Sequence, residues 1–410
     1  MQLARRFFLI ASLAALCLGT PDLAFAAHHG HGRPAHSSSK AKPAAKAEVI
    51  PANIPSVDNP ELLVDMQTGD TLYSTNAGKP WHPASLTKLM TAYVAFQAVA
   101  EGRLTLDSRV TMSVKAVSQA PASSGLPAGD SVTLKDALYI MLVKSANDMA
   151  WAVAETVGNG DVDAGVAQMN ATAARLGLTG THYDNPNGLP DEGQVTTARD
   201  LAVLAIDLRR TFPQYDDIFR TQAVSIGKVT LRTSNLMLKK FSGMTGMKTG
   251  YICGSGLNIV ATANRGGREL LAVVLGGTSE RERDQTAAHL LLRGFDNEFP
   301  DSGSSVVNVA NAVGVPPMDM KPLLCGKYAK GYVRARLKEF PMGLKGQPNY
   351  LTDKVVGETY VASDFGVPGK APVVATPSDD PTAEGDADTS DDTPSDAAAG
   401  PVPAPRPAGR

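Results

Sequence analysis

The 410-residue sequence has almost no net charge. Its 39 basic side chains nearly balance 41 acidic ones, which leaves a formal net charge of −2. A chain so close to neutrality lacks the basic excess typical of nucleic-acid-binding proteins, so we expect no nucleic-acid partner. Apolar residues nevertheless make up 43% of the chain, which is enough for a sizeable core. The length suits about two domains plus tails.

The N-terminus also lacks an apolar run long enough to span a bilayer, which takes about 20 residues. The run from Phe7 to Leu18 is shorter, follows Arg5 and Arg6, and is succeeded by the small-residue pattern Ala24-Phe25-Ala26. This combination predicts a cleaved secretory signal over residues 1–26. We therefore expect a protein secreted across the inner membrane of a bacterium into the periplasm.

Cysteine is scarce, with only Cys17, Cys253 and Cys325 in the chain. Cys17 follows Leu16, where a lipoprotein signal would carry a small residue, so lipid modification is not favoured. Cleavage of the signal leaves two cysteines. In an oxidising compartment they form one disulfide or remain as two buried thiols, and the sequence leaves both alternatives open.

The two ends of the mature chain lack the composition of a folded core. Residues 27–50 are rich in His, Ala, Ser, Lys and Pro, which is typical of a disordered linker. Residues 369–410 form an acidic, proline-rich tail without the apolar side chains that would offset ordering entropy. The tail has no amphipathic helical pattern, so no C-terminal membrane anchor is expected.

Residues 51–300 show the patterns of a mixed domain. Alternating residues predict two strands around a turn at 68–70 and a later strand pair around a hairpin at 264–267. Helical patterns fill the middle and return after residue 280. We therefore predict an α+β fold, with an antiparallel sheet, helices on its faces and an all-helical subdomain. Residues 301–368 contain strand-like pieces at 304–311 and 358–365, and their fold is not predicted.

Three short motifs carry candidate chemistry. In "PASLTKLM", Ser85 and Lys88 are three residues apart and share a helix face. The stretch "KSAND" (144–148) falls at a predicted break between two helices, and "MKTGY" (247–251) precedes the second strand pair. The motifs S-x-x-K, S-x-N and K-T-G, in this order, are the signature of serine penicillin-binding proteins and related β-lactamases.

Between about Val57 and Phe299 the chain resembles the D-alanyl-D-alanine carboxypeptidases, the low-molecular-mass type of penicillin-binding protein. The resemblance also covers "DNPNGLPDEGQVTTARDLA" and "GLNIVATA". It implies a β-lactamase/transpeptidase-like fold and removal of the terminal D-alanine from peptidoglycan stem pentapeptides. It implies β-lactams as covalent inhibitors and requires no metal or other cofactor.

A catalytic serine explains why Lys88 belongs in an apolar helix. A serine hydroxyl is a weak nucleophile at neutral pH and needs an adjacent base. Lys88 can be that base only when unprotonated, and both burial and a nearby cation such as Lys248 lower a lysine pKa. The pair Ser85 and Lys88 is therefore predicted to form and break the acyl-enzyme.

The resemblance assigns the remaining roles. Ser145 would relay a proton to the leaving amine, and the backbone N–H groups of Ser85 and Tyr251 would form the oxyanion hole. Tyr251 stands where some relatives carry histidine. The residues expected to bind the substrate are Asn147, Lys248, Thr249, Gly250, Tyr251 and Arg283. Gly250 would let the strand edge approach the substrate closely.

Three alternatives share these motifs. A D-alanyl endopeptidase would cut peptidoglycan cross-links with the same residues. A β-lactamase would need a deacylating glutamate, and Glu192 lacks the expected sequence context. A non-catalytic cell-wall-binding protein would not need the nucleophile, base and relay that are all present here.

Overall fold

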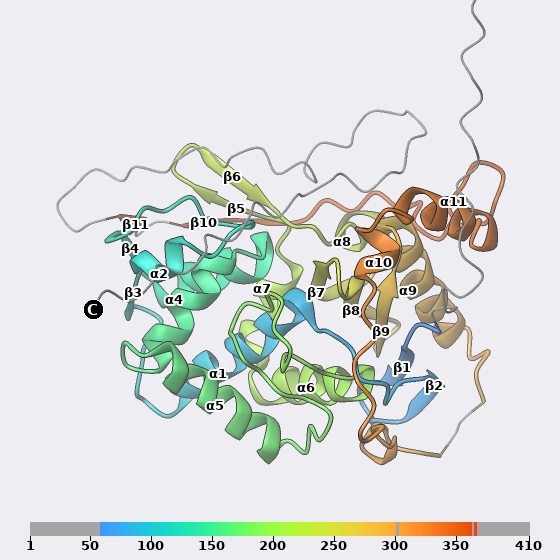
Figure 1. Ribbon diagram of the computed structural model, residues 1–410, viewed down its shortest axis with the longest axis horizontal. Coiled ribbons are helices and arrows are strands. Elements are labelled where there is room, and N and C mark those ends of the chain that lie inside the picture. The colour runs from blue at the N-terminus through green and yellow to red at the C-terminus, as the bar shows by residue number, and fades with distance from the viewer. Residues whose placement is uncertain (1–57, 301–302, 363–364, 367–410) are drawn as a thin grey trace, which may run out of the picture. The chain divides into compact units, whose positions relative to one another are not determined.

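The computed structural model describes residues 58–300, 303–362 and 365–366 (Figure 1). The predicted signal (1–26), linker (27–50) and acidic tail (369–410) lie outside the described residues. Within the described residues no helix is long and apolar enough to cross a membrane.

The centre of the fold is a five-stranded antiparallel sheet in the order β2-β1-β9-β8-β7. Both predicted turns are confirmed, since residues 68–70 join β1 to β2 and the β8–β9 pairing closes at Arg265 and Arg268. Strand β7, which carries the K-T-G motif, is an edge strand. The strands are β1 (Glu61–Asp65), β2 (Thr71–Thr75), β7 (Met244–Ile252), β8 (Gly256–Arg265) and β9 (Arg268–Gly277).

The sheet is buried on both faces, which follows from the two-residue period of a strand. Leu62 and Val64 face one apolar cluster, whereas Leu63 between them faces the other. Helix α9 (Glu280–Phe295) packs on the second face, mainly against β8 and β9. Short helix α8 (Met237–Lys240) contributes to the same cluster.

The first face is covered by the helical part of the chain. Thr197 caps α6 by accepting a hydrogen bond from the backbone amide of Asp200, a role that threonine commonly has at helix N-termini. The helices and helical turns are η1 (Ala84–Thr87), α1 (Lys88–Ala100), α2 (Val114–Val117), α3 (Leu134–Tyr139), η2 (Ile140–Lys144), α4 (Asn147–Val157), α5 (Val162–Arg175), α6 (Ala198–Thr211), η3 (Pro213–Tyr215) and α7 (Asp216–Arg220).

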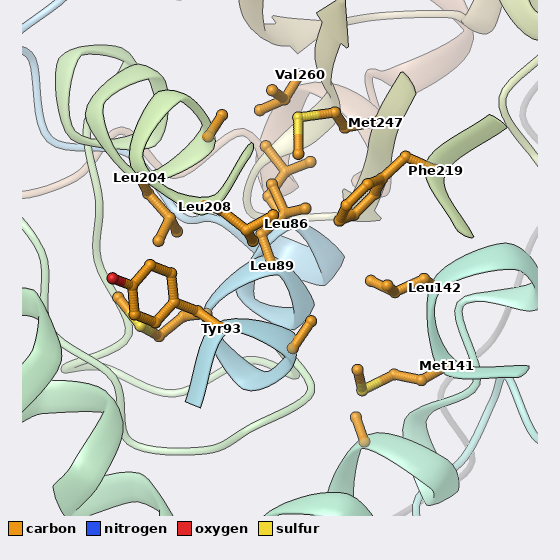
Figure 2. Packing of buried hydrophobic residues seen from close by; sticks show 14 of the residues in the cluster. Leu86, Leu89, Tyr93, Met141, Leu142, Leu204, Leu208, Phe219, Met247 and Val260 are labelled. Atoms are coloured by element: carbon orange, nitrogen blue, oxygen red, sulfur yellow. The ribbon is translucent and has the colours of Figure 1, made fainter. Parts of the chain in front are cut away.

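Helix α1 runs through the largest apolar cluster. Figure 2 shows Leu86 and Leu89 between side chains of α6, of η2 and of the sheet strands β7 and β8. Ser85 and Lys88 alternate with these two leucines in the chain. Core packing on several sides therefore fixes the turn that carries both polar residues.

The C-terminal segment, described over residues 303–362 and 365–366, packs along the rest of the fold (Figure 1). Its elements are η4 (Val306–Asn308), α10 (Lys321–Leu324), α11 (Ala329–Glu339), β10 (Thr359–Ala362) and β11 (Phe365–Gly366). The strand-like piece at 304–311 is not a strand: a helical turn occupies it, and only Ser305 makes a β-bridge, to Asp70. The piece at 358–365 does supply strands.

Those last strands complete two small sheets of the helical side. Strand β10 pairs in parallel with β5 (Ala223–Ile226), which also pairs with β6 (Val229–Arg232). Strand β11 pairs with β4 (Ser131–Thr133), which also pairs with β3 (Arg109–Thr111). The α+β class is confirmed: an antiparallel sheet carries helices on its faces beside an all-helical part.

Candidate active site

Ser85 lies on a tight helical turn directly before α1. Ala84 adopts a positive φ of 48°, which is uncommon for a residue with a side chain. The carboxamide of Asn258 on β8 donates to the carbonyl oxygen of His82 at 3.0 Å, which ties the turn to the sheet. Ser85 is half-buried, whereas Leu86 and Leu89 are fully buried, so the core anchors the turn and leaves the hydroxyl at its surface.

Lys88 begins α1 and is fully buried. Its Nζ lies 2.8 Å from Ser85 Oγ, 2.7 Å from Asn147 Oδ1 and 2.8 Å from the carbonyl oxygen of Asn187. Three oxygens thus hold one amine in a fixed position, and the spacing of Ser85 and Lys88 predicts the contact with the first of them. The third oxygen comes from a loop far away in the sequence.

The surroundings of Lys88 favour its neutral form. Burial is the main cause and the charge of Lys248 is the second, and together they hold the Lys88 pKa well below its ordinary value. The carboxyl group of Asp148 opposes this shift. A neutral lysine within hydrogen-bonding distance of a serine hydroxyl is the arrangement that general-base activation requires.

The S-x-N motif sits where helical geometry breaks down. The π-helical turn η2 ends at Ser145, which adopts left-handed φ and ψ angles of 68° and 27°. This conformation turns the Ser145 hydroxyl toward Lys248, whose Nζ lies 2.9 Å from it. Asn147 then begins α4, and its backbone N–H donates to the carbonyl oxygen of Ala122 at 2.7 Å.

Asp148, the residue after the motif, anchors the facing loop. Its carboxylate accepts hydrogen bonds from the amide and hydroxyl of Ser124, at 2.8 and 2.7 Å to the same oxygen. Burial raises the pKa of this carboxyl group, whereas these hydrogen bonds lower it. The buried pair of Asp148 and Ser124 therefore holds the start of α4 against the loop that contains Ser124.

The K-T-G motif lies on β7, opposite the S-x-N motif. Lys248 is buried and donates to the carbonyl oxygen of Thr249 at 2.8 Å, in addition to its contact with Ser145. Burial, followed by the charge of Arg283, lowers the Lys248 pKa to about 7. Thr249 Oγ1 lies 2.7 Å from Ser234 Oγ.

Gly250 sits where the strand and the nucleophile turn approach most closely. A Cβ at this position would lie 3.0 Å from the backbone nitrogen of Ser85 and 3.1 Å from that of Leu86. Both neighbours are backbone atoms of a packed turn, so neither can move cheaply. The structure thus explains why glycine follows Lys248-Thr249.

We expect Gly250→Ala to lower acylation by a β-lactam by about 100-fold, since a displacement of about 1 Å at a reacting group has effects of that size. The matched control is Gly254→Ala, because a Cβ there meets only ordinary contacts, the nearest at 3.4 Å from Asp319 Oδ1. Stopped-flow acylation rates would compare the two. Equal rates for both variants would show that the close approach at Gly250 is unimportant.

Two further predicted residues occupy different surroundings. Tyr251 follows Gly250 on the edge strand, and its side chain is 39% exposed. Arg283 is buried on α9 and bonds to Asp284 Oδ1 at 2.6 Å, while its Nη2 has no hydrogen-bond partner among the described residues. Its charge acts on Lys248. The predicted residues therefore gather in one place, with Arg283 near enough for its charge to lower the Lys248 pKa.

Sequence reasoning gave no roles to the loop that completes the site. Besides the Asn187 carbonyl group, the Gln194 carboxamide donates to Thr87 Oγ1 at 2.9 Å. Gly188 has a φ of +85°, and a Cβ there would lie 1.8 Å from the carbonyl oxygen of Ala84. The stretch "NPNGLPDEGQ" (185–194) is part of the resemblance to the family, but the sequence does not predict which residues it contacts.

The two cysteines whose oxidation state the sequence leaves undecided form a disulfide. Cys253 lies just after β7 and Cys325 just after α10, with their Cα atoms 5.8 Å apart. No group of three or more His, Cys, Asp or Glu side chains within residues 58–300 and 303–362 is arranged to hold a metal ion.

Comparison with known proteins is consistent with this geometry. Residues 51–279 match the family model described as D-alanyl-D-alanine carboxypeptidase. The chain belongs to the D-alanyl-D-alanine carboxypeptidase family. It is 33% identical over 305 residues to the D-alanyl-D-alanine carboxypeptidase DacD of Salmonella typhimurium, covering 72% of this chain and 73% of that protein. It is 35% identical to DacC of Escherichia coli, covering 62% of this chain and 65% of the relative.

Solved structures of the family confirm the β-lactamase/transpeptidase-like fold. Penicillin-binding protein 6B from Escherichia coli superposes with a TM-score of 0.55 at 33% identity, over 59% of this chain and 78% of that one. Penicillin-binding protein D2 from Listeria monocytogenes, solved in a cefotaxime-bound form, gives a TM-score of 0.51 at 28% identity, over 59% and 99% of the two chains. As a member of the carboxypeptidase family, the protein is a serine peptidase.

Proposed function

We propose that this protein removes the terminal D-alanine from peptidoglycan stem pentapeptides through an acyl-enzyme on Ser85. The observation that carries the proposal is the contact of Lys88 Nζ with Ser85 Oγ at 2.8 Å, in surroundings that hold the pKa of the amine well below its ordinary value. The relatives named above carry the same activity in their names. The mature protein would act in the periplasm, where its substrate is found.

In the acylation step Lys88 takes the proton of the Ser85 hydroxyl as Oγ bonds to the carbonyl carbon of the penultimate D-alanine. The C–N bond to the last D-alanine then breaks, and the proton held by Lys88 passes through the Ser145 hydroxyl to the departing amine, which returns Lys88 to its neutral form. Ser145 suits this relay because Lys248 Nζ lies 2.9 Å from its Oγ. Water subsequently attacks the ester, and Lys88 again acts as the base.

Charge that develops in this step needs partners that are already in place. We assign the oxyanion to the backbone N–H groups of Ser85 and Tyr251, and each such donor contributes about 3 kcal/mol to transition-state stabilisation. Lys248 and Thr249 would bind the terminal carboxylate, and Arg283 would add its positive charge to the same site. Asn147 would hold Lys88 and the substrate backbone.

A β-lactam would acylate the same serine, since its strained amide stands in for the D-alanyl-D-alanine bond. The Listeria relative has been solved in cefotaxime-bound and ampicillin-bound forms. A β-lactamase is less well supported, because the third partner of Lys88 is the backbone carbonyl group of Asn187 and not a carboxylate. Glu192 is exposed on the loop.

Product analysis tests the proposal. The mature chain, residues 27–410, would be incubated with a pentapeptide muropeptide and with its cross-linked dimer, and products identified by mass spectrometry. We expect the pentapeptide to lose one alanine, and enzyme blocked beforehand by a β-lactam to produce nothing. Cleavage of the dimer alone would identify an endopeptidase with the same mechanism. No product from either substrate would refute a peptidase role.

A further inference from the structure

A short piece of the C-terminal segment is fastened to the end of the catalytic strand. This tethered segment, Met318–Cys325, is joined to Cys253 by the disulfide, and the amide of Met320 donates to the carbonyl oxygen of Gly254 at 2.9 Å. Met320, Leu323 and Leu324 are buried in the large apolar cluster. The segment is therefore held by a covalent bond, a backbone hydrogen bond and its own apolar contacts.

Tyr251 lies between the reacting centre and the tethered segment. Its backbone follows Gly250 on β7, and its hydroxyl lies 3.4 Å from Cys325 Sγ and 3.9 Å from Cys253 Sγ. The residue is 39% exposed. Tyr251 thus reaches solvent one residue beyond Gly250, with its hydroxyl end at the disulfide.

The order of residues along β7 sets the direction of a bound substrate. Lys248 and Thr249, which would bind the leaving group, precede Tyr251, whose N–H would bind the carbonyl oxygen. An extended peptide on this free edge must then continue from the scissile bond past Tyr251 toward Ile252 and Cys253. The part upstream of the scissile bond is the part that becomes the acyl group.

We propose that Tyr251 and the tethered segment form the acyl-side wall of the substrate cleft and bind the peptide residues that precede the D-alanyl pair. This inference rests on the proposed function. Its ligand is an extended peptide that offers main-chain amides to the edge of β7 and side-chain surface to the Tyr251 ring. The disulfide keeps this wall at a fixed distance from Ser85.

Two substrates of different length test the wall: a full stem pentapeptide, and a minimal substrate with one blocked residue before D-alanyl-D-alanine. We expect the double variant Cys253→Ser/Cys325→Ser to lose about tenfold in kcat/KM on the pentapeptide, mostly through KM, as is typical when uniform binding is removed. On the minimal substrate it should retain wild-type kcat/KM within about twofold. Wild-type protein treated with a thiol reductant should reproduce the same split.

The reductant also serves as the control, since it should leave the double variant unchanged. Equal losses on both substrates would overturn the proposal, because the disulfide would then support the whole site and not one wall. Unchanged kinetics on both would overturn it as well, since the wall would not touch the peptide. A wild-type enzyme that processes neither substrate would instead contradict the proposed function.

Discussion

Replacing Ser85 by alanine is expected to lower kcat by more than about 10,000-fold, because losses of that order or greater follow removal of a catalytic nucleophile. The variant keeps the packing of the turn, since Leu86 and Leu89 anchor it and Ser85 itself is only half-buried. Folding should therefore be unaffected. The protein should also lose all covalent labelling by a fluorescent penicillin.

The measurement is release of D-alanine from the pentapeptide, with penicillin labelling followed on a denaturing gel and melting temperature as a folding check. Ser74→Ala is the matched control, because Ser74 is an exposed serine on β2, the opposite edge strand of the same sheet. It should behave as wild type. Residual labelling of Ser85→Ala at the wild-type rate would show that another residue is acylated.

Removing the amine of Lys88 should have the second-largest effect. Lys88→Met keeps the length and the apolar stem of the side chain but removes the base, and general-base catalysis contributes about 100- to 10,000-fold. We expect acylation by a β-lactam to slow by that factor. Asn147 Oδ1 and the Asn187 carbonyl oxygen would also lose the partner that they share in the wild type.

Those two oxygens make stability a necessary second readout for Lys88→Met. Each buried acceptor left unsatisfied costs about 1–3 kcal/mol, so the melting temperature should fall. Lys228→Met is the control, because Lys228 is exposed at the turn between β5 and β6. Acylation of Lys88→Met at the wild-type rate would exclude Lys88 as the base, whatever happens to stability.

Local patterns predicted the parts of the fold that local forces specify. The turn at 68–70, the hairpin at 264–267 and the break before Asn147 all occur as predicted. In each case neighbouring residues set the backbone conformation or the alternation of apolar side chains. The three motifs were found for the same reason, since each spans only three or four consecutive residues and its spacing is read directly from the sequence.

Local patterns do not predict contacts between residues that are far apart in the sequence. Nothing in the sequence shows that the Asn187 carbonyl group meets Lys88, because a backbone oxygen has no residue type to reveal it. The pairing of Cys253 with Cys325 was equally open, as it depends on where α10 packs. The valines of residues 304–311 favour a strand, yet the backbone hydrogen bonds of this stretch run to the turn at Gly69 and within the stretch itself.

The late position of β10 and β11 in the sequence has a consequence for the order in which the fold forms. Among the described residues, β11 is the strand that pairs with one side of β4, and β10 is the strand that pairs with one side of β5. Tyr360 also stacks on Tyr139 with ring centroids 3.6 Å apart. A chain is synthesised from its N-terminus, so these edges stay open until the last described residues emerge. Open edges are templates for pairing with other chains. A chain that stops short of residue 359 would therefore keep its catalytic motifs but leave two strand edges open to pairing with other chains.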